Sequence, residues 1–414
     1  VFLLKCGVQE YAWGKVGSDS EVAKLAQAGN KDFQLKDNAP YAELWMGTHP
    51  NCPSFIDGTE TTLEQWIKDN PDKLGSEVKK DFGGKLPFLF KVLSVQKSLS
   101  IQAHPHKVLA EHLHKTRPDI YKDPNHKPEM AIALTPFQGL CGFRVLKEIA
   151  EYVQEIEELR NVIGCQTACK FITASMATDM LLQREALKDA FKGLMEQDKE
   201  IIQTQLHKLV SRVKLLKENG EDISAYNGDL LLKLDNEFPG DVGGFAIYFL
   251  NIITLQPGEA MFLEADMPHA YLSGDCMECM ACSDNVVRAG LTPKFIDVHT
   301  LCEMLDYTCK PISKTRFQGI EQNNDIKVTQ FNPPVPDFSV TRFEIPDNVK
   351  TTKIAPINSA SISIVIQGEG HITNPTLATP ISIQRGSVLF TGAMEDLELQ
   401  VKSDVLLFRA SAGL

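Results

Sequence analysis

A short run from Leu99 to His106 carries side chains that are suited to chemistry. It reads Leu-Ser-Ile-Gln-Ala-His-Pro-His and follows a β-rich run, Leu89 to Val95. Side chains on an extended chain alternate between faces, so Ser100, Gln102 and His104 share one face. An amide oxygen and an imidazole two residues apart on one face are able to hold one metal ion. By itself, however, such a pair is more typical of a strand that faces solvent.

Two further segments supply ligands that would complete such a site. A proline-bracketed turn ends in Glu129, and His269 stands at the start of a strand. Taken singly, each is more typical of a surface or structural position. Together, Gln102, His104, Glu129 and His269 offer two imidazoles, one carboxylate and one amide oxygen, which suits zinc with a position left open for water or substrate. Without Gln102 the same set also suits non-haem iron, so the residue types leave the identity of the metal open.

Fixed positive charges follow in the segment from Gly274 to Lys294. Arg288 and Lys294 flank a glycine-containing turn and suit an anionic group or a developing oxyanion. Either residue alone would be read as half of a surface ion pair. The three cysteines of this segment do not predict a thiolate zinc site, because no second pair follows at zinc-finger spacing and a strand would turn them to alternate faces.

Length and composition indicate a large globular protein. At 414 residues the chain is too long for one ordinary core, and we expect two or three domains. The hydrophobic fraction of 43% and the charged fraction of 23% are those of a soluble protein. The longest apolar run, Phe245 to Leu255, is interrupted by polar residues and is too short to cross a bilayer. We therefore expect no membrane association.

The net charge and the cysteine content limit the binding partners and the location that we expect for this protein. A net charge of −12 argues against nucleic-acid binding, which needs a broad positive field, but a few local cations are enough for a small anionic substrate. The ten cysteines are scattered through a chain that shows no secretory signal, although it begins at Val1 rather than at Met. This pattern is typical of reduced thiols, so we expect a cytoplasmic location.

The hydrophobic periodicity changes along the chain. Up to about Arg144, short apolar runs alternate with Gly, Pro and Asn. From Leu146 to about Glu218 apolar residues recur at helical spacing, which predicts several amphipathic helices that end near Asn219. Beyond Gly240 we expect β structure throughout, beginning with one long strand over the apolar run named above.

The tail from about Pro336 to Leu414 predicts an antiparallel sandwich or jelly roll. The strands expected there are Ile362–Gln367, Ile381–Gln384, Ser387–Phe390, Leu397–Val401 and Val405–Arg409. A faint internal repeat accompanies them, because Gln256 to Phe262 matches Gln384 to Phe390 at Gln, Gly and Phe. When the two copies are aligned, Leu397 is the residue that corresponds to His269. If the repeat is real, only the first copy has kept its metal site.

Several long segments resemble the signatures of one family, the type I mannose-6-phosphate isomerases. The resemblance spans nearly the whole chain, helical part included. The segments that carry it are Gln9–Gly14, Ala42–Pro50, Tyr121–Glu129, His269–Gly274 and Met280–Lys294.

The resemblance implies a mainly β fold with an α insert, built as two cupin-type jelly rolls plus a helical domain. Residues 1–145 and 235–335 would form the catalytic jelly roll, 146–234 the helical domain and 336–414 the C-terminal jelly roll. It also implies one zinc ion per chain, held by Gln102, His104, Glu129 and His269, with Arg288 in the active site.

The reaction implied by the resemblance interconverts mannose 6-phosphate and fructose 6-phosphate, which supplies mannosyl donors such as GDP-mannose. A proton must leave one carbon and return to its neighbour through an enediolate, whose charge Arg288 would help to hold. Our candidates for the proton carrier are Lys127, Asp284 and Glu278, with His126 behind them.

For the phosphate group we expect Ser100 and Lys294. The expected partner is thus a small sugar phosphate, and a monomer is one option for the oligomeric state. Two other classes stay open. A cupin dioxygenase would use iron at similar ligands, and a non-catalytic phosphosugar-binding cupin would keep the binding groups but lack a proton carrier.

Overall fold

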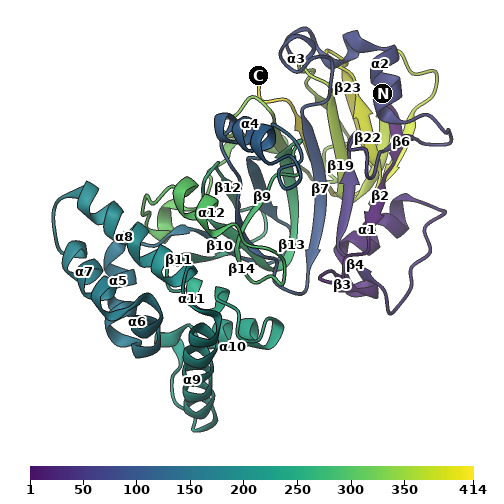
Figure 1. Ribbon diagram of the computed structural model, residues 1–414. Coiled ribbons are helices and arrows are strands. Elements are labelled where there is room, and N and C mark those ends of the chain that lie inside the picture. Colours follow the sequence, from purple (N-terminus) through teal and green to yellow (C-terminus); the bar gives the residue numbers. More distant parts are fainter.

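The computed structural model describes residues 1–414, except for the side chain of Asn323. Antiparallel β-sheets fill the centre and one side of the molecule, and a lobe of helices projects from the other side (Figure 1). The expectation of a mainly β fold with an α insert is confirmed. Among the described residues, no helix is both long and apolar enough to span a membrane.

A ten-stranded sheet forms the first β unit, which holds the candidate site. Its strands are β2 (Gly7–Gln9), β5 (Glu43–Met46), β7 (Phe88–Val95), β8 (Ile101–Ala103), β9 (Glu129–Ala133), β10 (Phe137–Phe143), β11 (Leu250–Leu255), β12 (Ala260–Leu263), β13 (His269–Ala281) and β14 (Val287–Gly290). The long strand β13 pairs with β7, β8, β9 and β10. It therefore brings residues from four neighbouring strands to one interior.

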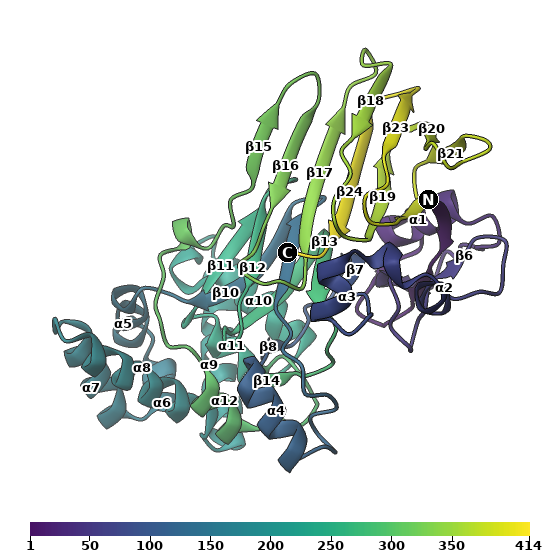
Figure 2. The ribbon, with the colours of Figure 1, turned by 90° about the horizontal axis from the view of Figure 1, so that it is seen from above.

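An eight-stranded and a four-stranded sheet form the second β unit, and Figure 2 shows β15, β16, β17, β24 and β19 of the larger sheet side by side. The larger sheet contains β1 (Phe2–Lys5), β6 (Phe55–Ile56), β15 (Ile320–Asn323), β16 (Lys327–Phe331), β17 (Ser339–Ile345), β19 (Ser361–Gln367), β22 (Val388–Thr391) and β24 (Val405–Ser411). The smaller sheet contains β18 (Thr351–Ile354), β20 (Glu369–Thr373), β21 (Ile381–Gln384) and β23 (Leu397–Val401). All five strands expected in the tail are present. A separate ribbon joins β3 (Lys15–Val16) to β4 (Pro40–Tyr41).

The two β units share one hydrophobic core, and the pleat of β7 shows how they are joined. Phe88, Phe90 and Val92 pack in a cluster with residues of β19, β22 and β24. Leu93, on the other face of β7, packs within the first unit. Because side chains alternate along a strand, Lys91 lies on the same face as Leu93 and is held inside the first unit.

The helical lobe confirms the helices expected from the 3.6-residue periodicity, and it continues with one more helix, α10, beyond their expected end near Asn219. Its helices are α5 (Leu146–Glu155), α6 (Glu157–Ile163), α7 (Cys165–Ser175), α8 (Met180–Met195), α9 (Lys199–Glu218) and α10 (Gly228–Glu237). Helix α9 ends where the sequence predicted, with Asn219 as its C-cap. The other helices are α1 (Glu21–Gly29), α2 (Leu63–Asp69), α3 (Ser76–Asp81), α4 (Lys107–Thr116), α11 (Gly243–Ala246) and α12 (Val298–Met304).

The expectation of one long strand from Phe245 to Leu255 was wrong. Helix α11 ends at Ala246, and β11 begins only at Leu250. Phe245 to Leu250 are all buried, so this part of the sequence has no polar face from which a helical or extended period could be read. The Asp241 carboxylate accepts the backbone N–H of Gly243 at 2.7 Å and favours a helical turn. Helix α12 likewise interrupts the β structure that we expected throughout this region.

Candidate active site

Three of the four expected metal ligands converge inside the first β unit. His104 follows β8, Glu129 begins β9 and His269 begins β13. Glu129 Oε2 lies 3.4 Å from His104 Nε2 and 3.2 Å from His269 Nε2. All three residues are buried, and one ligand atom from each lies within 4.8 Å of the others. This spacing lets one ion contact all three atoms.

The orientation of both imidazoles fits a metal ion. His104 Nδ1 lies 2.7 Å from the carbonyl oxygen of Asn285, and His269 Nδ1 lies 2.9 Å from that of Met267. A carbonyl oxygen only accepts, so each Nδ1 carries the proton and donates it. Each Nε2 then presents a lone pair, and neither has a hydrogen-bond partner among the described residues although both are buried. Two such nitrogens beside one carboxylate are explained by a shared cation.

The electrostatics of the group keep its ligands in metal-binding form. Burial lowers the pKa of His104 to about 4, against the opposing effect of Glu129, so the ring is neutral at pH 7. Burial alone would raise the pKa of Glu129, but its surroundings, the Lys127 ammonium above all, bring it well below its usual value. Lys127 Nζ lies 3.2 Å from Glu129 Oε1. The carboxylate is therefore ionised.

Strand register brings the fourth expected ligand and an arginine to the same place. Gln102 of β8 stands directly opposite His269 of β13 on one side and Arg288 of β14 on the other. Directly paired residues project from the same face of a sheet. Arg288 is half-buried, and burial lowers its pKa. It makes no ion pair or hydrogen bond with a described side chain, so its guanidinium is available to an anion.

A buried charged cluster lies beside the metal group, and the sequence indicated only one of its members, Glu278. Lys91 Nζ lies 3.6 Å from Glu278 Oε2 and 3.5 Å from Glu43 Oε2. The Tyr271 hydroxyl donates to Glu278 Oε1 at 2.8 Å. Burial raises the pKa of Glu278 to about 7, with Lys91 opposing the shift and Glu129 and Glu43 adding to it. The cluster therefore contains a carboxyl group that titrates near neutral pH.

The remaining expected residues lie in different surroundings. Asp284 is 3.4 Å from His49 Nε2, and a hydrogen bond from His49 lowers the pKa of its carboxyl. Ser100 is partly buried and lies two residues before Gln102. Lys294 is exposed and lines a cleft together with Lys97 and residues of the helical lobe.

Sequence reasoning also missed the residue that anchors the loop of Lys294. Asp241 Oδ1 accepts the backbone N–H of Leu291 at 2.7 Å, and its Oδ2 accepts that of Thr292 at 3.2 Å. Leu291 adopts a φ of 51°, a left-handed conformation that costs free energy in a branched residue. The Asp241 carboxylate thus fixes the chain between Arg288 and Lys294.

Two antiparallel β units, with a His-Glu-His group buried inside one of them, define a metal-binding protein of the cupin type. Family models of type I phosphomannose isomerase match three parts of the chain: the catalytic domain at residues 1–146, the helical insertion domain at 162–250 and the C-terminal part at 331–374. The chain belongs to the type I phosphomannose isomerase family.

Individual relatives agree with this assignment over the full length. The chain is 52% identical to mannose-6-phosphate isomerase of Bos taurus, with 99% of this chain and 98% of the relative covered. It is 51% identical to the Homo sapiens enzyme with the same coverage. A crystal structure of mannose 6-phosphate isomerase bound with zinc and yttrium superposes with a TM-score of 0.83 at 30% identity, covering 100% of this chain and 99% of the other.

Proposed function

We propose that this chain is a zinc-dependent mannose-6-phosphate isomerase that interconverts D-mannose 6-phosphate and D-fructose 6-phosphate. The observation that carries the proposal is the pair of unpartnered, buried Nε2 atoms beside Glu129, in a chain whose relatives carry this activity over their full length. One zinc ion would be held by Gln102, His104, Glu129 and His269. Bound there, it supplies a Lewis acid for the substrate oxygens.

The proposed reaction moves a proton between C1 and C2 of the open-chain sugar. Removing the proton next to the carbonyl leaves an enediolate, whose negative charge must be stabilised. Arg288 is assigned to this charge, because its guanidinium is half-buried, free of carboxylates and in register with Gln102. Return of the proton to the neighbouring carbon completes the isomerisation.

Among our candidates for the proton carrier, the electrostatics favour Glu278. A general base works best when its pKa is near the working pH, and Glu278 has a pKa of about 7. Asp284 has a lowered pKa and is the weaker base. Lys127 Nζ forms an ion pair with Glu129 Oε1 at 3.2 Å, so we assign Lys127 to positioning that carboxylate or a substrate oxygen. His126 is paired with Asp337 at 2.9 Å.

The phosphate group is assigned to Ser100 and Lys294. Ser100 precedes Gln102 by two residues, and the loop of Lys294 begins directly after β14, which carries Arg288. An unchanged affinity of Ser100→Ala for the sugar phosphate would remove Ser100 from this assignment.

Organisation and location are also proposals. We propose a monomer, because one chain supplies the metal group and Arg288, and a cytoplasmic location, because all ten cysteines are free among the described residues. For the domains we propose 1–145 with 235–335, then 146–234 and 336–414. The helices α5 to α9 lie within the middle division, but α10 continues to Glu237, past its proposed end at 234. The pairing of β15 and β16 with β17 favours a last boundary nearer residue 318.

The test is isomerase activity on mannose 6-phosphate before chelation, after chelation and after zinc is added back. We expect activity to disappear with the chelator and return with zinc. Glu129→Gln should abolish both zinc retention and activity, while Glu218→Gln, an exposed carboxylate in α9, should change neither. A protein that binds zinc and the sugar phosphate without turnover would instead be a non-catalytic phosphosugar-binding cupin.

A further inference from the structure

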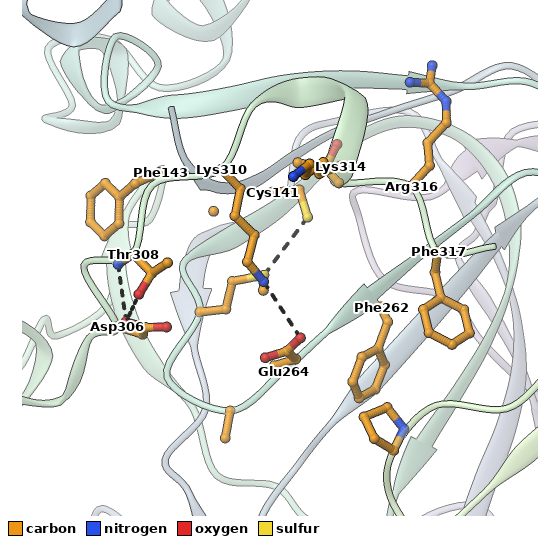
Figure 3. A pocket seen from close by; sticks show the side chains of 15 residues that line it. Cys141, Phe143, Phe262, Glu264, Asp306, Thr308, Lys310, Lys314, Arg316 and Phe317 are labelled. Atoms are coloured by element: carbon orange, nitrogen blue, oxygen red, sulfur yellow. Dashed lines mark hydrogen bonds and ion pairs between the residues drawn. The ribbon is translucent and has the colours of Figure 1, made fainter. Parts of the chain in front are cut away.

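A second cavity, of about 170 Å³, lies near the metal group, and none of the four proposed ligands lines it. Its walls come from the end of β10, the loop that follows β12 and the segment from Asp306 to Phe317 (Figure 3). Two backbone hydrogen bonds hold this segment, from Lys310 N to Phe143 O and from Phe317 N to Ala260 O. The residues between these two anchors form a roof over the cavity.

The apolar lining of the cavity is mainly aromatic. Phe262 and Phe317 stand on one side with their ring centroids 5.7 Å apart, and Phe143 stands on the other side. The side chain of Met267 also lines the cavity, and its polarisable sulfur packs favourably against aromatic rings. Such walls favour a flat, apolar body over a sugar.

The rim of the cavity carries one uncompensated positive charge. Four of the five charged lining residues have partners: Asp306 pairs with Arg184 at 2.8 Å, Arg316 with Glu259 at 3.2 Å, and Lys310 with Glu264 at 3.8 Å. Lys314 is exposed and makes no ion pair with a described residue. In Figure 3, the Lys310 side chain runs down toward Glu264, between Phe143 and Phe262, while Arg316 points away from the cavity. The net charge at the mouth is therefore that of Lys314.

We propose that this cavity binds a small organic anion that carries a single negative charge on an aromatic or similarly flat apolar body. The apolar walls would take the body, and the free ammonium of Lys314 would meet the negative group at the rim. Such a ligand differs in class from a sugar phosphate, because it brings a ring where the sugar brings hydroxyl groups. The proposal therefore stands apart from the isomerase assignment.

The loop beneath the cavity connects it to the metal group. Met267 lines the cavity, and its carbonyl oxygen accepts from His269 Nδ1 at 2.9 Å. Its neighbour Asp266 donates its backbone N–H to the carbonyl oxygen of His104 at 2.8 Å. A ligand packed on Met267 restrains the loop that supports both imidazoles. We therefore expect occupancy of the cavity to strengthen metal binding.

The test uses 4-fluorobenzoate as the probe, with the full-length, zinc-loaded protein and fluorine NMR as the readout. We expect saturable binding with a dissociation constant of about 1 mM, the range for a ligand of about ten non-hydrogen atoms. Lys314→Glu should weaken binding at least about tenfold, the effect of losing one charge contact of about 1.4 kcal/mol. Lys402→Glu, which changes an exposed lysine in the second β unit, is the matched control and should leave 4-fluorobenzoate binding unchanged.

Two further measurements distinguish this cavity from the metal site. Arg288→Ala should leave 4-fluorobenzoate binding unchanged, and the uncharged 4-fluorobenzamide should bind much more weakly. Saturating 4-fluorobenzoate should raise the apparent zinc affinity about fivefold in a chelator competition, at the low end of typical coupling. Absence of saturable binding, loss of binding in Arg288→Ala or equal binding of the amide would overturn the proposed site. An unchanged zinc affinity would overturn its coupling to the metal group.

Discussion

Lys91 and Glu278 stand directly opposite each other in β7 and β13, with Nζ and Oε2 3.6 Å apart inside the protein. Lys91 is also 3.5 Å from Glu43, so one buried ammonium serves two carboxylates. Burial would lower the pKa of Lys91, but the surrounding carboxylates raise it above its usual value. Burial, with Glu129 and Glu43 adding to its effect, raises the pKa of Glu278 to about 7, so this carboxyl group takes up a proton near neutral pH.

The first prediction concerns the pH dependence of stability in the metal-free protein. The pKa of Glu278 is about 7 in the folded chain and close to 4.5 when unfolded, so folding favours the protonated form. Its contribution to the free energy of unfolding is fully present below pH 4.5 and is lost as the pH rises toward 7. In Glu278→Gln the side chain at this position cannot ionise. We therefore expect the free energy of unfolding of the variant, minus that of the wild type, to rise by on the order of 3 kcal/mol between pH 4.5 and 8.

Urea unfolding of both proteins at several pH values measures this difference. Glu185→Gln, an exposed carboxylate in α8, is the control and should give a flat difference. A flat difference for Glu278→Gln as well would mean that the carboxyl group titrates near its ordinary pKa in the folded protein.

The second prediction concerns Arg288. Because this side chain makes no ion pair with a described residue, Arg288→Ala should fold with wild-type stability. If the guanidinium stabilises the enediolate, the variant should lose about 10²- to 10³-fold in kcat with a smaller change in KM. Steady-state kinetics and a thermal melt check both parts, with Arg184→Ala in α8 as the control. A loss confined to KM would assign Arg288 to substrate binding instead.

The metal group was predictable from sequence because its signal is carried by residue type and strand alternation. Gln102 and His104 share a face, and the chemistry of Glu129 and His269 completes a ligand set. The distances confirm that His104, Glu129 and His269 converge. That convergence depends on β13, which joins four strands from distant parts of the chain, and no local pattern encodes such a register.

The charged cluster was missed, although one signal was present. Lys91 interrupts the apolar run from Phe88 to Val95, where a charge is expensive unless it is paired. Its partner Glu43 lies almost fifty residues earlier in the sequence, so the pair emerges only when β5 and β7 align. A lysine inside a fully buried strand should therefore be treated as evidence for a buried partner.

The internal repeat has a structural counterpart at its turns. In the first copy, Glu259 N donates to Gln256 O at 2.9 Å, and in the second Ser387 N donates to Gln384 O at 2.9 Å. Each turn leads into a short strand, β12 or β22. His269 begins β13 and its counterpart Leu397 begins β23, so the weak sequence match located equivalent positions in the two β units.

The third prediction concerns a residue that supports a metal ligand from behind. The backbone carbonyl oxygen of Asn285 accepts a hydrogen bond from His104 Nδ1. The side-chain amide of Asn285 donates to the carbonyl oxygens of Asp123 and Asn125 at 2.6 and 3.0 Å. Asn285→Ala removes these two bonds and loosens the loop that orients the imidazole. We expect zinc affinity to fall about tenfold or more. Competition with a chelator measures this, and Asn219→Ala, at the exposed end of α9, should leave the affinity unchanged.

The fourth prediction concerns Asp241, a positioning residue with no expected contact to the substrate. Its carboxylate accepts three backbone N–H groups, from Gly243, Leu291 and Thr292, and so ties the loop of Lys294 to the start of α11. Asp241→Asn weakens these bonds because its amide offers one accepting oxygen in place of two. With weaker bonds, Leu291 can leave its left-handed conformation, and the loop that carries Lys294 moves. If Lys294 binds the phosphate group, we expect KM for mannose 6-phosphate to rise about tenfold with kcat nearly unchanged. Asp229→Asn, an exposed carboxylate in α10, should leave both constants unchanged. Equal losses in kcat and kcat/KM would show instead that the loop orients Arg288 for the chemical step.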